Sequence, residues 1–402
     1  ATTATVNFGQ DSSFSGAKST ENANADGNGH GSFAYAPPSG FLSLCSQNLP
    51  DVDIIDGTEH FNTVLYAGNN GSQSVSGVSF SPDFVWLKRR NDANGHKLYD
   101  SIRGAGINLN ISTGTEASSA NGYFTAFDSD GFSLAGGDNA HNTSGGTYAA
   151  WNWLAGTAFS NDASATSVGT IDSSGQVNAT AGFSIVSYTG TTTTNTNTGI
   201  AHGLSQKPDL IIIKNRDWAS SSKGWPVWHS AIPTGGVYLD NTDISEADNF
   251  NYFFGAQPTS DVFNVRADTN VSTGNRYRSF GRADDYIAYC FANTDGYLKA
   301  GSYTGNGSSD GPFVYTGFRP AWVMWKRSDS TGPWGMFDSS RDIDNTVGQQ
   351  ISANSSDAEG TTTSNNSDFL SNGFKMRGSA TNSNASGGTY IYLAFAESPF
   401  KF

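Results

Sequence analysis

Histidine, the side chain used most often for acid–base catalysis and metal binding, shows no spacing here that points to chemistry. A transition-metal site usually contains a His-x-His or Glu-x-x-His pair, and neither occurs. No Gly-x-Ser-x-Gly stretch stands where a strand would turn into a helix, as a catalytic serine of that type requires. The six histidines are His30, His60, His96, His141, His202 and His229. The sequence therefore predicts no catalytic residue, no bound metal and no cofactor.

One polar loop begins like a calcium-binding loop. Asn22, Asn24 and Asp26 alternate with other residues and Gly27 follows, as in the first half of an EF-hand loop. The twelfth position, where a bidentate glutamate would complete the ligand set, is Phe33. We therefore interpret this segment as a polar turn without a metal.

Three tryptophans lie in stretches whose composition is typical of loops, and two interpretations of them stay open. Trp218, Trp225 and Trp334 stand close to Gly, Ser, Lys and Pro residues. An exposed indole face stacks well on a sugar ring, which makes these residues candidates for binding a glycan. The alternative, which we favour, is that each ring anchors its own loop.

The composition predicts an all-β fold. Charged residues make up 14% of the chain and Gly fills 47 positions, yet 13% of the residues are aromatic. Aromatic side chains favour strands and can fill a core, whereas Gly, Asn and Ser supply the turns between short strands. Few stretches show the apolar stripe of a helix.

The charge and hydropathy of the chain exclude two classes of partner. The formal net charge is −14, and an acidic surface repels the phosphate backbone of nucleic acids. No stretch approaches the roughly 20 apolar residues of a membrane-spanning helix, and nothing resembles a signal peptide. We therefore expect neither nucleic-acid binding nor membrane insertion.

The chain has two cysteines, Cys45 and Cys290, which cannot staple a protein of this length. Buried free thiols are the preferred interpretation, because free cysteine is among the residues most often buried. A disulfide between them is the alternative.

One unit of about 100 residues, long enough for a small β-sandwich, occurs three times. Each copy begins with Tyr-x-Gly, continues with a proline and an apolar run that ends in lysine six positions later, and closes with a tyrosine and a second aromatic five positions on. The apolar runs are Pro82–Lys88, Pro208–Lys214 and Pro320–Lys326. The closing pairs are Tyr148 and Trp153, Tyr286 and Phe291, and Tyr390 and Phe395.

The repeat predicts tandem β-sandwich-like units at residues 61–156, 183–298 and 299–402, here called units one, two and three. The proline-led run is typical of a strand that is buried on both faces and begins at the proline. We expect the lysine to mark the point where this strand leaves the core. Residues 157–182 form either a linker or an additional edge strand, and Val168–Ile171 favours the strand. Unit two also carries extra residues near Trp218–Trp228 and Asp240–Phe254, which we expect to be surface loops.

Acidic residues of the repeat show no pair suited to hydrolysing a glycosidic bond, which requires two facing carboxylates. Asp83 and Asp209 correspond to each other, but unit three has Ala321 there. Asp100 and Asp338 also correspond, whereas unit two has His229, and we interpret this position as a tolerant surface site.

Two N-terminal stretches resemble a junction found in structural proteins of marine phages. Residues 7–14 read Asn-Phe-Gly-Gln-Asp-Ser-Ser-Phe, and residues 37–45 read Pro-Pro-Ser-Gly-Phe-Leu-Ser-Leu-Cys. In that family the first stretch closes a SPRY-type β-sandwich and the second opens the next region. Residues 301–307 and 387–397 are similar to the C-terminal part of the same proteins.

The resemblance implies a virion structural protein of the tail-fibre type, with residues 1–60 forming the end of a SPRY-like sandwich plus a connector. It transfers no catalytic or binding residue. The body of the SPRY domain is missing, so we expect that the chain begins inside a longer polypeptide or after processing.

Three functions are compatible with the sequence. The first is a non-enzymatic tail fibre or adhesin on the exterior of the virion, in contact with other virion proteins and with a host surface glycan or receptor. Such a segment would be a homo-oligomer, a trimer by analogy with other fibres. The second is a capsid or head decoration protein. The third, which we favour least, is a depolymerase of surface glycans.

Overall fold

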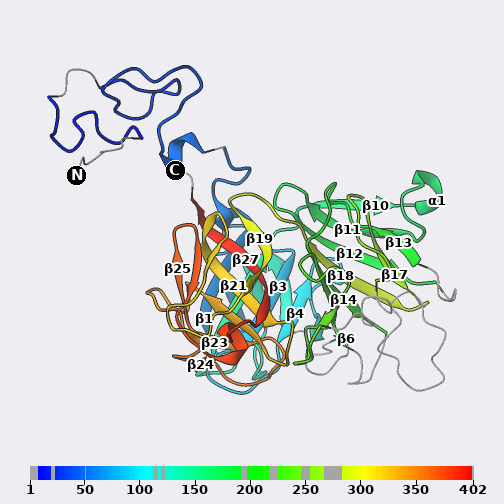
Figure 1. Ribbon diagram of the computed structural model, residues 1–402. Helices are drawn as coiled ribbons and strands as arrows, with labels where there is room; N and C mark the ends of the chain where they lie inside the picture. The colour runs from blue at the N-terminus through cyan, green and yellow to red at the C-terminus, as the bar shows by residue number, and fades with distance from the viewer. Residues whose placement is uncertain are drawn as a thin grey trace.

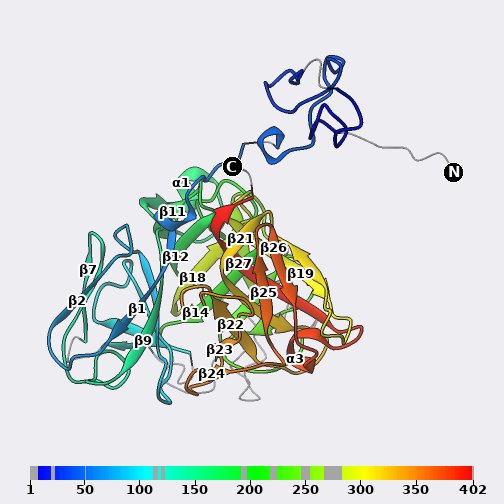
Figure 2. The ribbon, with the colours of Figure 1, turned by 90° about the vertical axis from the view of Figure 1, so that its left-hand side faces the viewer.

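A computed structural model describes residues 8–19, 23–49, 51–111, 116–118, 123–191, 197–217, 224–245, 254–266 and 283–400. Residues 51–400 form a β-rich body, and residues 8–49 stand apart from it in both views of Figures 1 and 2. The described part of this N-terminal segment contains a short 3-10 helix, Ser46–Asn48, and no strand. Phe8 and Gly9, in the stretch that resembles the end of a SPRY-type sandwich, form no strand.

Unit one is an antiparallel sheet of six strands faced by a sheet of three. The larger sheet has the order β1 (Phe61–Ala67), β9 (Thr147–Trp153), β3 (Phe84–Arg89), β4 (Lys97–Asp100), β5 (Ile107–Asn110) and β6 (Glu116–Ser118). The smaller sheet has the order β2 (Gln73–Ser76), β8 (Gly131–Leu134) and β7 (Phe124–Asp128).

Unit two repeats this plan and incorporates the segment before it. Its large sheet has the order β10 (Thr157–Asn161), β11 (Ser173–Asn178), β12 (Phe183–Thr189), β18 (Asp285–Phe291), β14 (Leu210–Asn215), β15 (Pro226–His229) and β16 (Val237–Tyr238). The facing pair is β13 (Asn197–Ala201) with β17 (Val262–Arg266). Residues 157–182 thus supply the edge strand β10, the strand β11 next to it and the short helix α1 (Ala163–Thr166), although Val168–Ile171 lies between the two strands.

Unit three has the order β19 (Leu298–Thr304), β27 (Thr389–Pro399), β21 (Phe318–Arg327), β22 (Trp334–Asp338), β23 (Gln349–Ser352) and β24 (Gly360–Thr361). Its small sheet has the order β20 (Phe313–Tyr315), β26 (Gly373–Met376) and β25 (Ser367–Leu370), and a short helix, α3 (Thr381–Asn384), precedes β27. Strand β21 runs through Pro320, where a register shift interrupts the ladder and accommodates the missing N–H.

The predicted all-β fold class is confirmed, since helices are confined to short turns in the described chain. The three large sheets also place corresponding strands in the same order: opening strand, closing strand, proline-led strand and the strand after it. In each, the opening tyrosine pairs with the closing tyrosine, and their rings stack 4.9 Å apart. These pairs are Tyr66 with Tyr148, Tyr188 with Tyr286, and Tyr303 with Tyr390. We take this match as support for the predicted repeat.

Central strands of each large sheet are buried on both faces. In unit one, one face packs against the small sheet of the unit and the other face packs against the other units. On β9, Tyr148 and Ala150 belong to a cluster with Phe124 and Phe132 of the small sheet of unit one. Residues of the opposite face, represented by Trp151, belong to a second cluster that contains residues of all three units. The alternation follows from the two-residue period of a strand.

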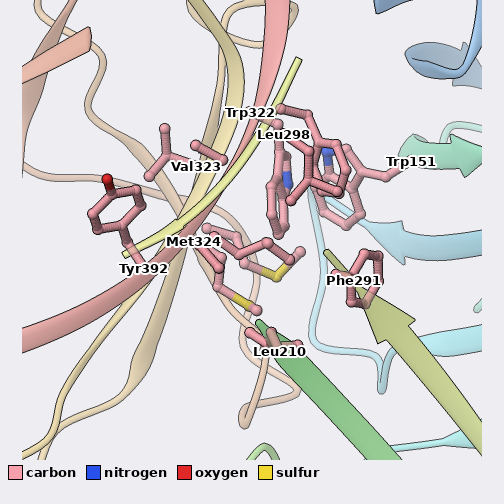
Figure 3. Packing of buried hydrophobic residues seen from close by; sticks show 14 of the residues in the cluster. Trp151, Leu210, Phe291, Leu298, Trp322, Val323, Met324 and Tyr392 are labelled. Atoms are coloured by element: carbon pink, nitrogen blue, oxygen red, sulfur yellow. The ribbon is translucent and has the colours of Figure 1, made fainter. Parts of the chain in front are cut away.

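The second cluster is a shared core at the centre of the body. Phe61 of unit one stacks on Phe395 of unit three with ring centroids 4.8 Å apart, and Phe84 of unit one stacks on Tyr289 of unit two at 4.4 Å. Figure 3 shows this convergence for Trp151, Leu210, Phe291, Trp322 and Met324. Units one and two each keep a smaller interior between their own two sheets. The three large sheets also close around one common aromatic interior, so the units are not independent of one another as tandem sandwiches would be.

The lysine that ends each apolar run does not mark an exit from the core, which corrects the expectation from sequence. Lys88, Lys214 and Lys326 are all 0% exposed. Lys326 Nζ donates to the Gly332 carbonyl oxygen at 2.9 Å, and Lys214 Nζ lies 5.6 Å from the ring centre of Trp225. Burial lowers the pKa of Lys88 and of Lys326 to about 8.

The shared core predicts that residues 51–400 unfold as one cooperative body. Trp153 touches aromatic rings of its own unit and of unit three. We expect Trp153→Ala to lower the free energy of unfolding by about 3–5 kcal/mol while the transition stays single. Urea unfolding followed by fluorescence and by far-ultraviolet circular dichroism measures both. Leu65→Ala, at a 40% exposed side chain of β1, is the control and should change stability by less than about 1 kcal/mol. Separate transitions for the units would contradict the shared core.

Candidate functional site

The tryptophans proposed as glycan-stacking residues are not exposed where the structure describes them. Trp225 is 0% and Trp334 is 1% exposed, and Trp218 lies outside the described residues. Trp334 Nε1 donates to the carbonyl oxygen of Tyr238 in unit two at 2.7 Å. The glycan-stacking interpretation is therefore wrong for Trp225 and Trp334, whose rings have no free face for a sugar. Trp334 instead joins unit three to unit two.

Polar contacts between units follow a cyclic pattern. Trp151 Nε1 of unit one donates to Asp338 Oδ2 of unit three at 3.0 Å. Tyr289 Oη of unit two donates to Asp100 Oδ2 of unit one at 2.7 Å. Unit three has Leu393 at the corresponding place of its closing strand, and a leucine has no donor to offer.

His229 completes this cycle and corrects our interpretation of its position as a tolerant surface site. The side chain is 0% exposed, and its Nε2 lies 3.1 Å from the carbonyl oxygen of Tyr392, the neighbour of Leu393. The imidazole of His229 therefore donates the hydrogen bond between the units, because Leu393 of β27 cannot donate one. A carboxylate at this position would have no donor to accept from. The substitution of His for Asp is matched to the residue that it faces.

Each buried carboxylate of the cycle has an arginine three residues later. Arg103 Nε lies 2.6 Å from Asp100 Oδ2, and Arg341 Nε lies 2.6 Å from Asp338 Oδ2, with all four side chains 0% exposed. Unit two, which has the neutral His229, carries Ile232 at that place. Burial opposes the charge of Arg103, but the adjacent Asp100 outweighs it and raises the pKa of the guanidinium.

Two glutamates extend these pairs across the unit boundaries. Glu359 of unit three accepts hydrogen bonds from Arg90 of unit one at 2.7 and 3.0 Å, and from Arg341 at 2.9 Å. Glu116 of unit one accepts from Arg216 of unit two at 2.7 Å. Burial works against the charge of Glu359, yet the two arginines hold its pKa below the usual range. Asp100 and Asp338 of the repeated motif thus belong to structural ion pairs.

Asp83 and Asp209 hold the chain where it leaves a closing strand. Asp83 Oδ2 accepts from the backbone N–H groups of Ala155 and Gly156 at 2.9 and 2.7 Å, and Asp209 Oδ2 accepts from that of Asn293 at 2.9 Å. In unit three, β27 continues as a strand to Pro399, so Ala321 has no such turn to hold. This accounts for the acid in two units and its absence in the third.

No group of three His, Cys, Asp or Glu residues able to hold a metal occurs among the described residues. Asp26 of the polar loop instead accepts hydrogen bonds from Ser43 and Asn48. No helix within the described ranges is long and apolar enough to cross a membrane. Cys45 and Cys290 are both free, the first half-buried and the second buried.

Two grooves on the body, which sequence reasoning missed, form the candidate binding site. The first, here the Asn293 groove, has a volume of about 620 Å³ and is lined by Asp53, Gln206, Asn293 and Asp295 among others. The second, here the Tyr315 groove, has a volume of about 180 Å³ and is lined by Val52, Lys299 and Tyr315 among others.

The two grooves adjoin each other. Asp295 lines both, and the consecutive residues Val52 and Asp53 line one each. Gly296 has a φ of +78°, and a Cβ there would come within 2.7 Å of Val52 Cγ1, so glycine lets the connector lie close to the body. Tyr315 is 59% exposed on the edge strand β20. The sequence signal that could have pointed to this groove is the difference between Tyr315 in unit three and its counterpart in unit one, Ser76.

The buried ion pairs give a test of the cyclic contacts. We expect Asp100→Ala to lower the free energy of unfolding by about 3–5 kcal/mol, because Arg103 keeps a buried charge without its partner. Glu397→Ala, which removes an exposed ion pair with Arg319, should cost about 0–1 kcal/mol. Urea unfolding of both variants measures the difference.

A rescue variant makes this test specific. Asp100→His, Arg103→Ile and Tyr289→Leu together copy the set that meets at His229, and this triple variant should be more stable than Asp100→Ala alone. A triple variant no more stable than Asp100→Ala would contradict the matched substitution.

Buried histidines predict that stability falls in mild acid. Burial lowers the pKa of His229 to about 4 from an ordinary 6.5, against the weaker influence of Tyr392 O and Asp209. The unfolded chain therefore takes up a proton near pH 6.5 and the folded chain only near pH 4. The contribution of neutral His229 is complete above pH 6.5 and is lost progressively as the pH falls from 6.5 to 4. We expect His229→Gln to reduce the slope of stability against pH in this window by about 1.4 kcal/mol per pH unit. Equal slopes for both proteins in urea titrations would refute the assignment.

Comparison with known proteins gives one match. No curated protein and no solved structure matches the chain. A family model described as a domain of unknown function, DUF7483, matches residues 56–399, which covers the three large sheets, the three small ones and the short 3-10 helix Gly57–Glu59 before them. The chain therefore belongs to the DUF7483 family.

Proposed function

We propose that this protein is a non-enzymatic structural component on the exterior of a phage particle, a tail-fibre or adhesin segment that contacts the host surface. The observation that carries the proposal is the resemblance of residues 7–14 and 37–45, and of two stretches of unit three, to marine phage structural proteins. The SPRY-like assignment of residues 1–60 belongs to this proposal, since the matched family begins at residue 56.

The shared core supports a mechanical role. Three sheets that bury their large aromatic side chains against one another resist local opening, because most of each central strand is enclosed on both faces. The acidic residues of the repeated motif are engaged in ion pairs and turns, and so are not poised for acid–base work. A rigid body that holds loops and grooves at its surface suits adhesion better than turnover.

The N-terminal segment supports contact with other virion proteins. Several of its large apolar side chains are exposed, among them Phe8 at 54%, Tyr35 at 74%, Phe41 at 67% and Leu44 at 73%. Such a concentration of apolar surface usually marks a contact with another protein. The homo-oligomer, a trimer by analogy, remains part of the proposal, since several copies on one particle would let weak contacts add up.

The position of the protein on the particle tests this function. We expect electron microscopy of intact particles labelled with an antibody to residues 51–400 to place the protein at the tail, and particles lacking it to adsorb poorly to their host. Label on the head lattice with normal adsorption would instead support the head-decoration alternative. Release of oligosaccharides from host envelope material by the purified chain would overturn the non-enzymatic assignment.

A further inference from the structure

Two aromatic side chains are exposed on one strand of unit three without contributing to its core. Strand β20 alternates, so that Val314 is buried at 6% exposure while Phe313 and Tyr315 are 45% and 59% exposed. Burying an aromatic side chain is one of the largest single sources of hydrophobic stabilisation. Leaving two of them in water forgoes that gain, so their role is better sought outside the fold.

Unit one shows that the fold does not need these rings. Val75 pairs with Phe132 as Val314 pairs with Phe374, so β2 and β20 occupy the same place in their units. At the positions of Phe313 and Tyr315, unit one has Ser74 and Ser76, both exposed. The tyrosine is therefore an addition to a scaffold that accepts serine at the same point.

Tyr315 differs from Phe313 in its surroundings. Its side chain lines the Tyr315 groove together with Asp51, Lys299 and Thr316, whereas Phe313 does not line that groove. In unit one, Asn62 stands where unit three has Lys299, so a second lining side chain also differs between the two copies. An apolar ring beside carboxylate, ammonium and hydroxyl groups is the combination that positions a polar ligand with one apolar face.

The adjoining Asn293 groove is lined by neutral hydrogen-bonding groups and two carboxylates. Thr180, Ser205 and Gln206 offer hydroxyl and amide groups, and Asp53 is exposed beside them. The Asn293 amide is bonded at both ends to the backbone of Ala300 and helps to shape the groove wall. A sugar hydroxyl both donates and accepts, so such a mixed surface can satisfy it in several orientations. The groove has room for a ligand of ordinary pocket size.

Charge distinguishes between classes of sugar. Asp51, Asp53 and Asp295 face the two grooves against one cation, Lys299, and the whole chain carries a net charge of −14. A sulfated or uronic-acid polymer would be repelled by this field, while a neutral or amine-bearing polymer would not.

We propose that the Tyr315 groove and the Asn293 groove together bind a neutral or amine-bearing glycan, with one sugar ring stacked on Tyr315 and its neighbour held by the polar lining of the Asn293 groove. This inference rests on the proposed contact with a host surface and names the site and the class of ligand for it. The candidate stacking residue is thus the exposed Tyr315 and no longer the buried Trp225 and Trp334.

Binding of the full chain to oligosaccharides tests the site. The probes are maltohexaose and cellohexaose as neutral glycans, a fully deacetylated chitosan hexamer as the amine-bearing glycan, and hexagalacturonate as the anionic glycan. The variant is Tyr315→Ser, which installs the residue of unit one. The matched control is Phe313→Ser on the same strand, outside the groove. Saturation-transfer difference spectra detect binding, and titration gives the Kd.

We expect the wild-type chain to bind a neutral or amine-bearing probe more tightly than hexagalacturonate. Tyr315→Ser should weaken this binding at least about tenfold, and Phe313→Ser should leave it within about twofold. The inference is overturned if the chain binds none of the probes, prefers the anionic one, or responds equally to the two variants.

Adsorption of particles separates this inference from the proposed function. If particles lacking the protein adsorb poorly while particles carrying Tyr315→Ser adsorb normally, the groove is not the contact and the adhesin function stands. If particles lacking the protein adsorb normally, the adhesin function itself fails.

Discussion

Aromatic side chains from the three large sheets pack into one shared interior, and this packing constrains nearly everything else in the molecule. A sheet that is covered on one side by its own small sheet would normally face water on the other side. Here the second face is also apolar. Trp153 and Phe291, at the ends of β9 and β18, both contact Phe395 of β27 at the common centre. The strands of one unit therefore complete their burial only against strands of the other two.

The unit boundaries show how the repeat tolerates substitution. A buried carboxylate is stable only with a partner for its charge and its lone pairs. In two places Asp, Arg and a Trp or Tyr donor occur together. In the third, His229 and Ile232 replace Asp and Arg, and Leu393 replaces the donor. The three positions change as a set because any one of them alone would leave a buried group unpaired.

The sequence predicts the strands well but not the relation between units. Periodic features such as the proline-led runs and the closing aromatic pairs fix strand identity, since alternation and burial act locally. What the second face of a strand packs against depends on contacts between residues far apart in the sequence. Nothing in the run Pro82–Lys88 therefore reveals that Phe84 will stack on Tyr289. The buried lysines were misjudged for the same reason: their covering residues come from distant parts of the chain or from neighbouring loops.

The candidate site was missed for a related reason. Trp225 and Trp334 have loop-like neighbours in sequence, yet both are fully buried members of the shared core. Tyr315 follows an unremarkable alternation, and its exposure becomes informative only when Ser76 is recognised as its counterpart. Comparing the copies position by position separates what the fold requires from what one unit has added.

Hydrogen exchange of the intact chain measures the shared core most directly. If the three sheets form one body, the central amides of β9, β18 and β27 exchange only through global unfolding. Their opening free energies should then agree with one another and with the free energy from urea unfolding. A closing strand that exchanges at a much lower opening free energy than the other two would show that its unit opens alone, and would contradict the account.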